Sequence, residues 1–316
     1  MTLSDIRNVK IINHLNHICK EWLYYEEIGV KHNRPVGIKI RDDDAELLTD
    51  YVFDVKGTGG KSHGYDHTDG TETKVINLFQ HKFCNSLVEY NKKGKSKDTK
   101  KCKAIGEEHK LHYKSEVCDL CGESKFIPMD DSRAGIDSRA HFNGVGVIPR
   151  YIIWILLSSN NVVTLKGYIF DSKNPFLNEI LHEQLVNGTE DNNTKNFMPY
   201  GLEWYLSNPL LFAQYEFEIV DNCYQVKPVF FSLDNPLSEK IYLKEHLNPI
   251  KKNALHRKSD AKEAIIEILG DKDEYTYSEF VENDLVKINW KSTQGKKRGE
   301  TKRRHININD TIIVDE

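Results

Sequence analysis

The sequence lacks a long apolar run. Its longest, residues 151–157, is too short to cross a bilayer and instead predicts a buried strand. The amino-terminal residues also lack a basic segment followed by an apolar one, which argues against a secretory signal. We therefore expect a soluble, cytoplasmic protein, and its 316 residues are enough to bury a substantial core.

A strong net charge is also missing. The formal net charge of -4 argues against a generally basic surface for binding nucleic acid. A local basic cleft is still compatible with the composition, because the chain has 44 Lys and Arg residues and two basic clusters at 296–298 and 302–304. The distribution of charge therefore matters more than the total.

Cysteine is scarce. Six cysteines do not form a disulfide scaffold in a chain of this length, and four of them lie between positions 84 and 121. Cys118 and Cys121 form a CxxC turn followed by Gly122, an arrangement that brings two thiolates to one Zn²⁺. This clustering predicts a structural zinc site.

A closed zinc site needs four ligands, so two more must come from upstream. We expect Cys84 and Cys102, with His109 or His112 as a substitute for one of them. The remaining two cysteines, Cys19 and Cys223, fall on apolar patterns and are predicted to be core residues.

Hydrophobic periodicity predicts alternating helices and strands. Helices are expected over 4–27, from Asp42 to Leu48, over 175–186 and over 260–269; strands are expected over 71–79, 151–157, 162–170 and 225–233. The apolar strand at 151–157 should be central and paired in a hairpin with 162–170. Aromatic residues are dense between 204 and 217, where we expect them to pack in the core. The fold class that follows is α/β, with a mixed central sheet flanked by helices.

Two further polar segments are weaker indicators of function. Residues 54–62 approach a phosphate-binding loop but lack its first glycine, so we exclude an NTPase and expect an ordinary Gly-rich loop. The acidic run at 42–46 is interpreted as the solvated first turn of a helix.

The segment from Asp66 to Lys74 has a clearer chemical meaning. Glu72 and Lys74 are two residues apart on the expected strand, so their side chains should leave the same face. The Asp69-Gly70 pair is typical of a hairpin turn, and Asp66 or Asp69 should then arrive from the paired strand. Two carboxylates in this arrangement can hold Mg²⁺, and a lysine beside them can position a water molecule next to a phosphate.

Residues 130–142 are polar but lie between apolar segments. We interpret them either as a surface loop with a helix cap or as a loop near an active cleft. In the second case Arg133, Arg139 or His141 would contact a phosphate or a base edge of DNA.

The order of these features resembles the PD-(D/E)xK nuclease superfamily, particularly type II restriction endonucleases with a zinc knuckle inserted after the Glu-x-Lys strand. The resemblance covers residues 1–185 and implies a restriction-endonuclease-like core. It implies that Asp66 and Glu72 bind Mg²⁺ and that Lys74 positions the attacking water.

The resemblance leaves the first acid open. No proline precedes Asp66, and the gap to Glu72 is short, so Asp69 and Asp54 remain alternatives. Asp66 is preferred because Asp69-Gly70 is better suited to making the turn. Gln80, at the far end of the same strand, is a weaker additional candidate.

This interpretation divides the chain into three parts. Residues 1–185 form the nuclease core, with the zinc insertion at about 81–126. Residues 186–290 either belong to the same unit or form a second region for DNA recognition and dimerisation. Residues 291–316 form a basic tail.

The functional hypothesis is a Mg²⁺-dependent, site-specific endonuclease that cuts double-stranded DNA as a homodimer, because cutting both strands of a palindrome usually requires two symmetric active sites. One alternative is a non-catalytic zinc-containing DNA-binding module, in which Glu72 and Lys74 form an ordinary surface ion pair. A second is an HNH nuclease with His141 as its base.

Overall fold

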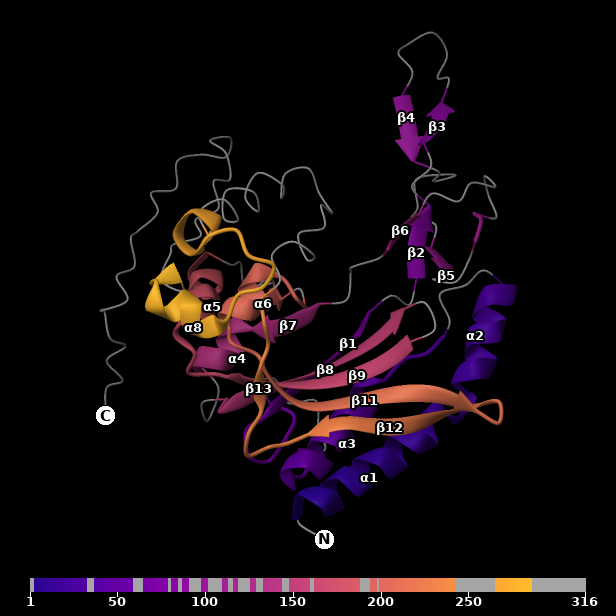
Figure 1. Cartoon of the computed structure of the whole chain (residues 1–316), viewed down its shortest axis with the longest axis horizontal. Coiled ribbons are helices and arrows are strands. Elements are labelled where there is room, and N and C mark those ends of the chain that lie inside the picture. The colour runs from indigo at the N-terminus through magenta and orange to yellow at the C-terminus, as the bar shows by residue number, and fades with distance from the viewer. Residues whose placement is uncertain are drawn as a thin grey trace.

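The computed structural model of the chain describes residues 3–32, 37–58, 65–78, 81–84, 87–90, 98–101, 110–112, 116–118, 126–128, 133–143, 148–159, 162–187, 194–197, 199–241 and 265–285. A mixed sheet with the strand order β1-β8-β9-β11-β12 lies at its centre, and β13 also pairs with β11 (Figure 1). The strands are β1 (Glu72–Leu78), β8 (Arg150–Ser159), β9 (Val162–Asp171), β11 (Leu210–Val220), β12 (Cys223–Phe231) and β13 (Leu237–Ser238).

The pairing of these strands confirms a mixed sheet. Strand β1 runs parallel to β8, whereas every other pair in this sheet is antiparallel. The apolar run predicts that β8 is covered on both faces, and all side chains from Tyr151 to Leu156 are buried. The predicted α/β class, a mixed central sheet flanked by helices, is therefore confirmed.

The amino-terminal helices cover one face of the sheet. They are α1 (Leu3–Ile18), the short 3₁₀ helix η1 (Cys19–Glu21), α2 (Trp22–Lys31) and α3 (Asp42–Phe53). Their apolar residues, among them Leu15, Trp22 and Leu48, form one core cluster with Trp154 and Phe212 of the sheet. The predicted helix over 4–27 is confirmed, with a 3₁₀ turn inside it.

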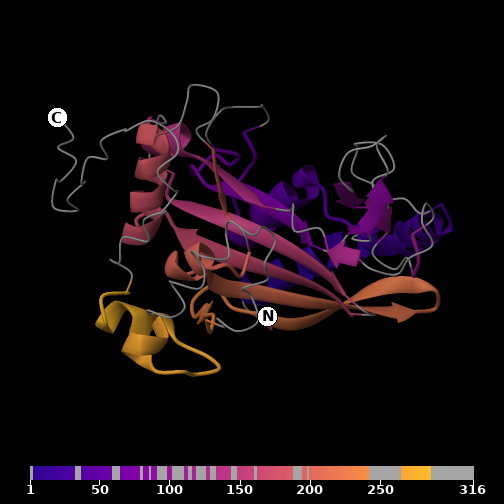
Figure 2. The same cartoon turned by 90° about the horizontal axis from the view of Figure 1, so that it is seen from above.

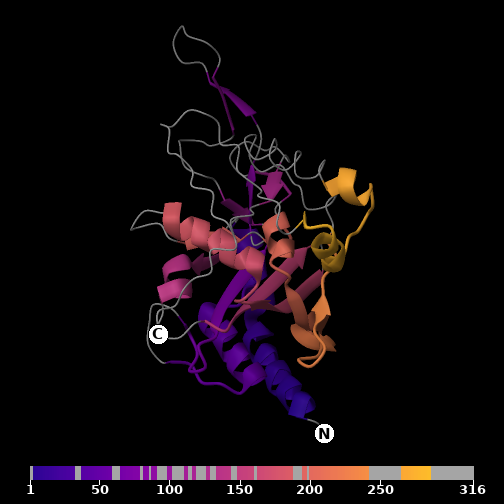
Figure 3. The same cartoon turned by 90° about the vertical axis from the view of Figure 1, so that its left-hand side faces the viewer.

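A second set of elements covers the opposite face (Figures 1 and 3). It comprises α4 (Ser138–Asn143), α5 (Pro175–Asn187), α6 (Leu202–Leu206), α8 (Tyr277–Glu282) and the two-stranded sheet of β7 (Ala134–Asp137) and β10 (Thr194–Phe197). Phe176, Trp204 and Phe280 pack in a second core cluster with Tyr151 and Tyr168. Each face of the sheet is thus closed by its own apolar layer.

The region after residue 186 completes the central sheet. Strands β11 and β12 pair with each other, and β11 pairs with β9, so residues 210–231 belong to the same layer as β1 and β8. Figure 2 shows the turn between β11 and β12 at one end of the sheet and α8 at the other. Trp204, Phe212 and Tyr215 are fully buried, which confirms the prediction that these aromatic residues form core.

The prediction of a core position is confirmed for Cys19 and wrong for Cys223. Cys19 is fully buried. Cys223 is exposed because it directly follows the turn at Asp221 and Asn222, both of which have positive φ. Asp and Asn adopt this left-handed conformation more readily than other non-glycine residues, and they end β11 here.

The segment after β1 forms small sheets apart from the central one, as expected of an insertion (Figure 1). Strand β2 (His81–Cys84) pairs with β5 (Lys110–His112) and β6 (Phe126–Pro128), and β3 (Leu87–Tyr90) pairs with β4 (Asp98–Lys101).

The predicted zinc ligands are only partly described. Cys84 lies on β2 and Cys118 is buried. Cys102, Cys121 and His109 lie outside the described residues, as do Gln80 and the carboxy-terminal tail at 291–316.

None of the helices within the described ranges has the length and apolar content needed to span a membrane.

Candidate functional site

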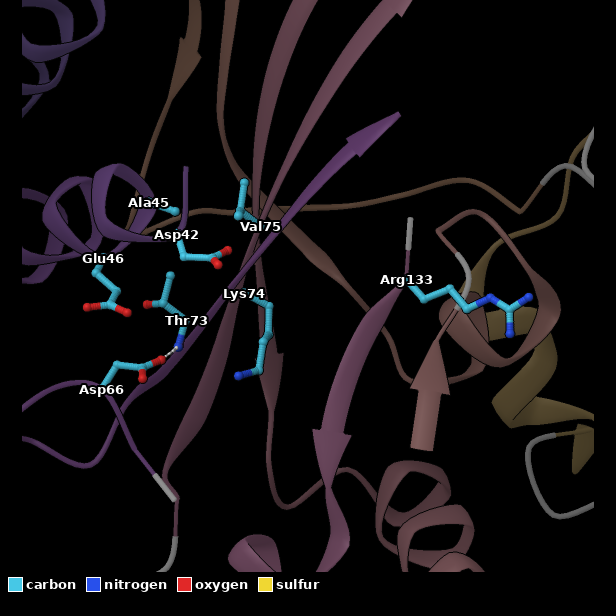
Figure 4. Close-up of a pocket in the computed structure, with 8 residues that line it drawn as sticks. All are labelled: Asp42, Ala45, Glu46, Asp66, Thr73, Lys74, Val75 and Arg133. Atoms are coloured by element: carbon cyan, nitrogen blue, oxygen red, sulfur yellow. Dashed lines mark hydrogen bonds between the residues drawn. The ribbon is translucent and has the colours of Figure 1, made fainter. Parts of the chain in front are cut away.

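A cleft of about 330 Å³ opens beside β1, which lies at the edge of the described central sheet, and the start of α3. Its lining residues are Asp42, Ala45, Glu46, Asp66, Thr73, Lys74, Val75 and Arg133 (Figure 4). Three of the polar residues in this set are carboxylates, and Lys74 extends between β1 and the loop that carries Asp66. The cleft therefore combines acidic side chains with one strand-borne lysine.

Glu72 and Lys74 lie side by side on one face of β1, as their spacing predicts. Lys74 Nζ donates a hydrogen bond to Glu72 Oε1, and the side chains are only 30% and 14% exposed, respectively. The surface pair Lys227–Glu218, at 60% and 55% exposed, is a useful contrast. The Glu72–Lys74 pair is thus partly desolvated, unlike an ordinary surface ion pair.

Burial changes the ionisation of this pair. Desolvation raises the pKa of Glu72 from 4.5 to about 7, and nearby Asp66 adds to the effect, although the charge of Lys74 opposes it. Desolvation also acts to lower the pKa of Lys74, but the charge and hydrogen bond of Glu72 outweigh it, so the net shift is upward. Lys74 therefore remains a cation at neutral pH, whereas Glu72 titrates close to neutrality.

Asp66 lies on a loop rather than on the predicted hairpin strand. The expectation of a paired strand is wrong, because Gly57 and His67 form only an isolated bridge, whereas β1 pairs in parallel with β8. The loop closes through the backbone N–H groups of Asp66 and His67, which both donate to Thr71 O at 3.1 Å. Asp66 nevertheless reaches the cleft, where its Oδ2 accepts a hydrogen bond of 2.8 Å from the Thr73 backbone N–H.

The geometry favours Asp66 over the other candidates for the first acid. Asp69 is bound elsewhere: its Oδ2 accepts from Arg150 at 2.6 Å and its Oδ1 from the Thr71 backbone at 3.0 Å. Burial would raise the pKa of Asp69, but the hydrogen bonds of Thr71 and the charge of Arg150 lower it overall. Asp54 directly follows α3 and has a φ of 55°. Neither Asp54 nor Asp69 lines the cleft.

Glu46 lines the cleft, although its place in the sequence did not lead us to expect this. The acidic start of α3 is not merely a solvated surface, because Asp42 and Glu46 line the cleft and Asp44 is buried against Arg41. Burial and the charge of Asp66 raise the pKa of Glu46. The spacing carries a signal: Asp42, Glu46 and Asp50 are four residues apart, and such positions share one face of a helix.

The carboxylates around the cleft include one oxygen that is available to a hard divalent cation. Glu72 Oε2 is buried and has no hydrogen-bond partner, so it is a carboxylate oxygen with free coordination capacity. Among the described residues, no three Asp, Glu, His or Cys side chains are already gathered closely enough to hold one ion. A cation would therefore compete with Lys74 for Glu72 and draw Asp66 or Glu46 closer.

Two of the predicted DNA-contacting residues lie at the surface. Arg133 borders the cleft, but its guanidinium extends away from the carboxylates (Figure 4). Arg139 is exposed in the first turn of α4, where Asp137 Oδ1 accepts a 2.8 Å hydrogen bond from its backbone N–H.

His141 does not match the expectation of a surface loop that contacts DNA, because its side chain is only 4% exposed. Its Nδ1 lies 2.6 Å from Tyr151 Oη and its Nε2 lies 2.8 Å from Asn178 Oδ1. Burial lowers its pKa despite the bond to Asn178. Contacts of α4 with β8 and α5 thus place this residue in the core.

No family model, curated protein or solved structure matches this chain.

Proposed function

We propose that the protein is a Mg²⁺-dependent nuclease that hydrolyses phosphodiester bonds at the cleft between α3 and β1. The observation that carries the proposal is the partly desolvated Glu72–Lys74 pair, in which one carboxylate oxygen has no partner, beside a cleft lined by Asp66 and Glu46. Burying a carboxylate oxygen without a partner costs free energy, and a bound cation would offset that cost.

Each residue has a defined part in this proposal. Asp66 and Glu72 would hold Mg²⁺, with Glu46 as a further oxygen ligand. When bound, Mg²⁺ supplies Lewis-acid activation of water and neutralises charge on the phosphate. Lys74 remains protonated, so it orients the attacking water as a hydrogen-bond donor and offsets the negative charge that develops on the phosphate.

The substrate class and the assembly follow from the sequence resemblance to type II restriction endonucleases. The substrate we propose is double-stranded DNA, and a homodimer would supply two active sites for the two strands. A structural Zn²⁺ in the insertion, held by Cys84, Cys102, Cys118 and Cys121, completes the proposal.

Both alternative functions have less support. A DNA-binding module with an ordinary surface pair at Glu72 and Lys74 does not account for the burial of that pair. An HNH nuclease would need His141 as an accessible base, and both ring nitrogens of this buried residue have hydrogen-bond partners.

The test is an incubation of purified protein with supercoiled plasmid and phage DNA in Mg²⁺. We expect discrete fragments, and we expect Glu72→Gln and Lys74→Met to abolish them. The matched controls are Glu218→Gln and Lys227→Met, which break an exposed pair on the opposite edge of the sheet and should leave cleavage unchanged.

Other outcomes assign the function differently. A gel shift without cleavage in any divalent metal would favour the DNA-binding module. Cleavage that survives both substitutions but is lost in His141→Ala would favour the HNH mechanism.

A further inference from the structure

A chain of buried polar side chains lies directly beneath the cleft and connects three segments of the fold. His67 is fully buried, with Nδ1 2.8 Å from Asp50 Oδ1 on α3 and Nε2 2.7 Å from Thr73 Oγ1 on β1. Thr73 Oγ1 also lies 3.0 Å from Thr49 Oγ1, which accepts from Trp154 Nε1 at 3.1 Å. The imidazole therefore joins α3, its own loop and β1.

The directions of these hydrogen bonds show that His67 Nε2 donates to Thr73 Oγ1. Thr49 donates its single hydroxyl hydrogen to Ala45 O at 3.1 Å, so it accepts from Thr73. The Thr73 hydroxyl hydrogen is then used, and Thr73 Oγ1 must accept from His67 Nε2. At the other side of the ring, Nδ1 lies 2.8 Å from Asp50 Oδ1. Both ring nitrogens thus have fixed hydrogen-bond partners, which determine the orientation of the ring.

His67 is linked to the proposed cation ligands through the residue before it in the chain and through its hydrogen-bond partner Thr73. Asp66 directly precedes His67, and Thr73 stands between Glu72 and Lys74. The Thr73 N–H donates to Asp66 Oδ2, so one residue of β1 is bound to both Asp66 and His67.

The Asp50 contact extends this control to Glu46. Asp50 lies one helical turn after Glu46 on α3, so the bond from His67 to Asp50 holds the helix face that carries Glu46 against the loop.

We propose that His67 is a positioning residue that holds Asp66 and Glu46 at a set distance from Glu72. The inference rests on the proposed function only in taking these carboxylates as cation ligands. It predicts that breaking the His67–Thr73 contact weakens divalent-cation binding even though neither side chain touches the cation. Loss of an outer-shell partner typically lowers metal affinity by about 10- to 100-fold.

The test measures Mn²⁺ binding by calorimetry in the absence of DNA, for the full chain and for variants shown by circular dichroism to be folded. Thr73→Val removes the hydroxyl at nearly constant shape, and His67→Gln removes the two-sided contact; each should weaken binding about 10-fold or more. Thr73→Ser restores the hydroxyl and should stay within about threefold of the wild type. Tyr215→Phe removes a buried hydroxyl bound to Asn8, away from the cleft, and is the control for general destabilisation.

The outcomes separate this inference from the nuclease proposal. Folded Thr73→Val and His67→Gln proteins that bind Mn²⁺ as tightly as the wild type would overturn the positioning role, even if the wild type cuts DNA. Weakened binding in these variants, with Thr73→Ser and Tyr215→Phe unaffected, supports it even if no DNA is cut. If both disruptive variants fail to fold, Asp50→Asn is the deciding variant, because it keeps the shape of the side chain and should still lower the affinity for Mn²⁺. Unchanged affinity in Asp50→Asn would overturn the positioning role. A wild type that binds no Mn²⁺ would overturn it as well.

Discussion

Asp66 Oδ2 accepts a 2.8 Å hydrogen bond from the backbone N–H of Thr73, the residue between Glu72 and Lys74. This bond brings a loop carboxylate to the strand that carries the other two charged groups. It also distinguishes Asp66 from Asp69, whose carboxylate is bound to Arg150 and Thr71.

The two acids should consequently respond differently to the same substitution. Asp66→Asn should reduce cleavage by at least about 100-fold, because the amide is a poor cation ligand, while the protein remains folded. Asp69→Asn should instead lower the free energy of unfolding by about 1 kcal/mol through the weakened Arg150 contact, with cleavage retained. Urea titration and plasmid cleavage measure the two effects; loss of cleavage in Asp69→Asn alone would make Asp69 the first acid.

The raised pKa of Glu72 predicts a pH dependence of stability in the metal-free protein. Because its pKa rises from 4.5 to about 7 on folding, the folded state holds a proton that the unfolded state releases within this interval. The stabilisation linked to this proton is complete below pH 4.5 and is lost as the pH rises through about 7. At about 1.4 kcal/mol per pH unit, the upper limit of the loss is about 3 kcal/mol.

Chemical denaturation in EDTA at several pH values measures this loss. The free energy of unfolding of the wild type should fall relative to that of Glu72→Gln between pH 4.5 and 7, whereas Glu218→Gln should track the wild type. A constant difference between wild type and Glu72→Gln would mean that Glu72 is ionised throughout.

Glu46 should contribute differently to stability and to cation binding. Burial and the neighbouring charge of Asp66 raise its pKa, so the ionised side chain disfavours the metal-free fold. Glu46→Gln should increase the free energy of unfolding by about 0.5 kcal/mol, a small figure because the side chain is partly solvated. The same variant should weaken cation binding in calorimetry; unchanged binding would remove Glu46 from the proposed ligands.

The contact of Gly167 with two aromatic rings predicts a steric effect in the core. A Cβ atom at Gly167 would lie 2.7 Å from Phe212 Cζ and 2.8 Å from Trp154 Cζ3. Gly167→Ala should therefore destabilise the protein by about 1–3 kcal/mol, the usual cost of overpacking. Gly57→Ala, whose Cβ would meet only contacts of 3.9 Å or more, is the control in thermal unfolding. Equal melting temperatures for the two variants would show that the core relaxes around the added methyl group.

The sequence predicted the helices and strands whose hydrophobic pattern reflects burial on one face or on both faces of the element. The long apolar run of β8 and the amphipathic pattern of α5 are local features, and both elements were expected at nearly their observed positions. The aromatic residues near Trp204 were correctly expected in the core because a large ring gains most from burial.

Strand pairing and the burial of single polar residues depend on residues that are distant in the sequence, so they could not be predicted in this way. The turn signal at Asp69-Gly70 is real, since Gly70 has a φ of 85°, but the strand after it pairs in parallel with β8 instead of with the segment before it. His141 was expected in a polar loop, and its contacts with Tyr151 and Asn178, which are distant in the sequence, show that it is buried.

At the candidate site, a two-residue spacing was sufficient to predict that Glu72 and Lys74 share one face of a strand. Glu46 was not expected in the cleft because its position there depends on how α3 lies against the loop of Asp66. Its four-residue spacing from Asp42 and Asp50 was the available signal.

The sharpest test of the nuclease proposal is the cleavage of supercoiled plasmid in Mg²⁺ by the wild type and by Lys74→Met. Lys74 is the one residue whose proposed role is catalytic rather than cation-binding, so the variant should still bind Mn²⁺ in calorimetry. We predict discrete fragments for the wild type and at least a 100-fold lower cleavage rate for Lys74→Met, on the order expected for loss of a donor that stabilises charge in the transition state. Cleavage by Lys74→Met at the wild-type rate, or no cleavage by a folded wild type that binds Mn²⁺, would contradict it.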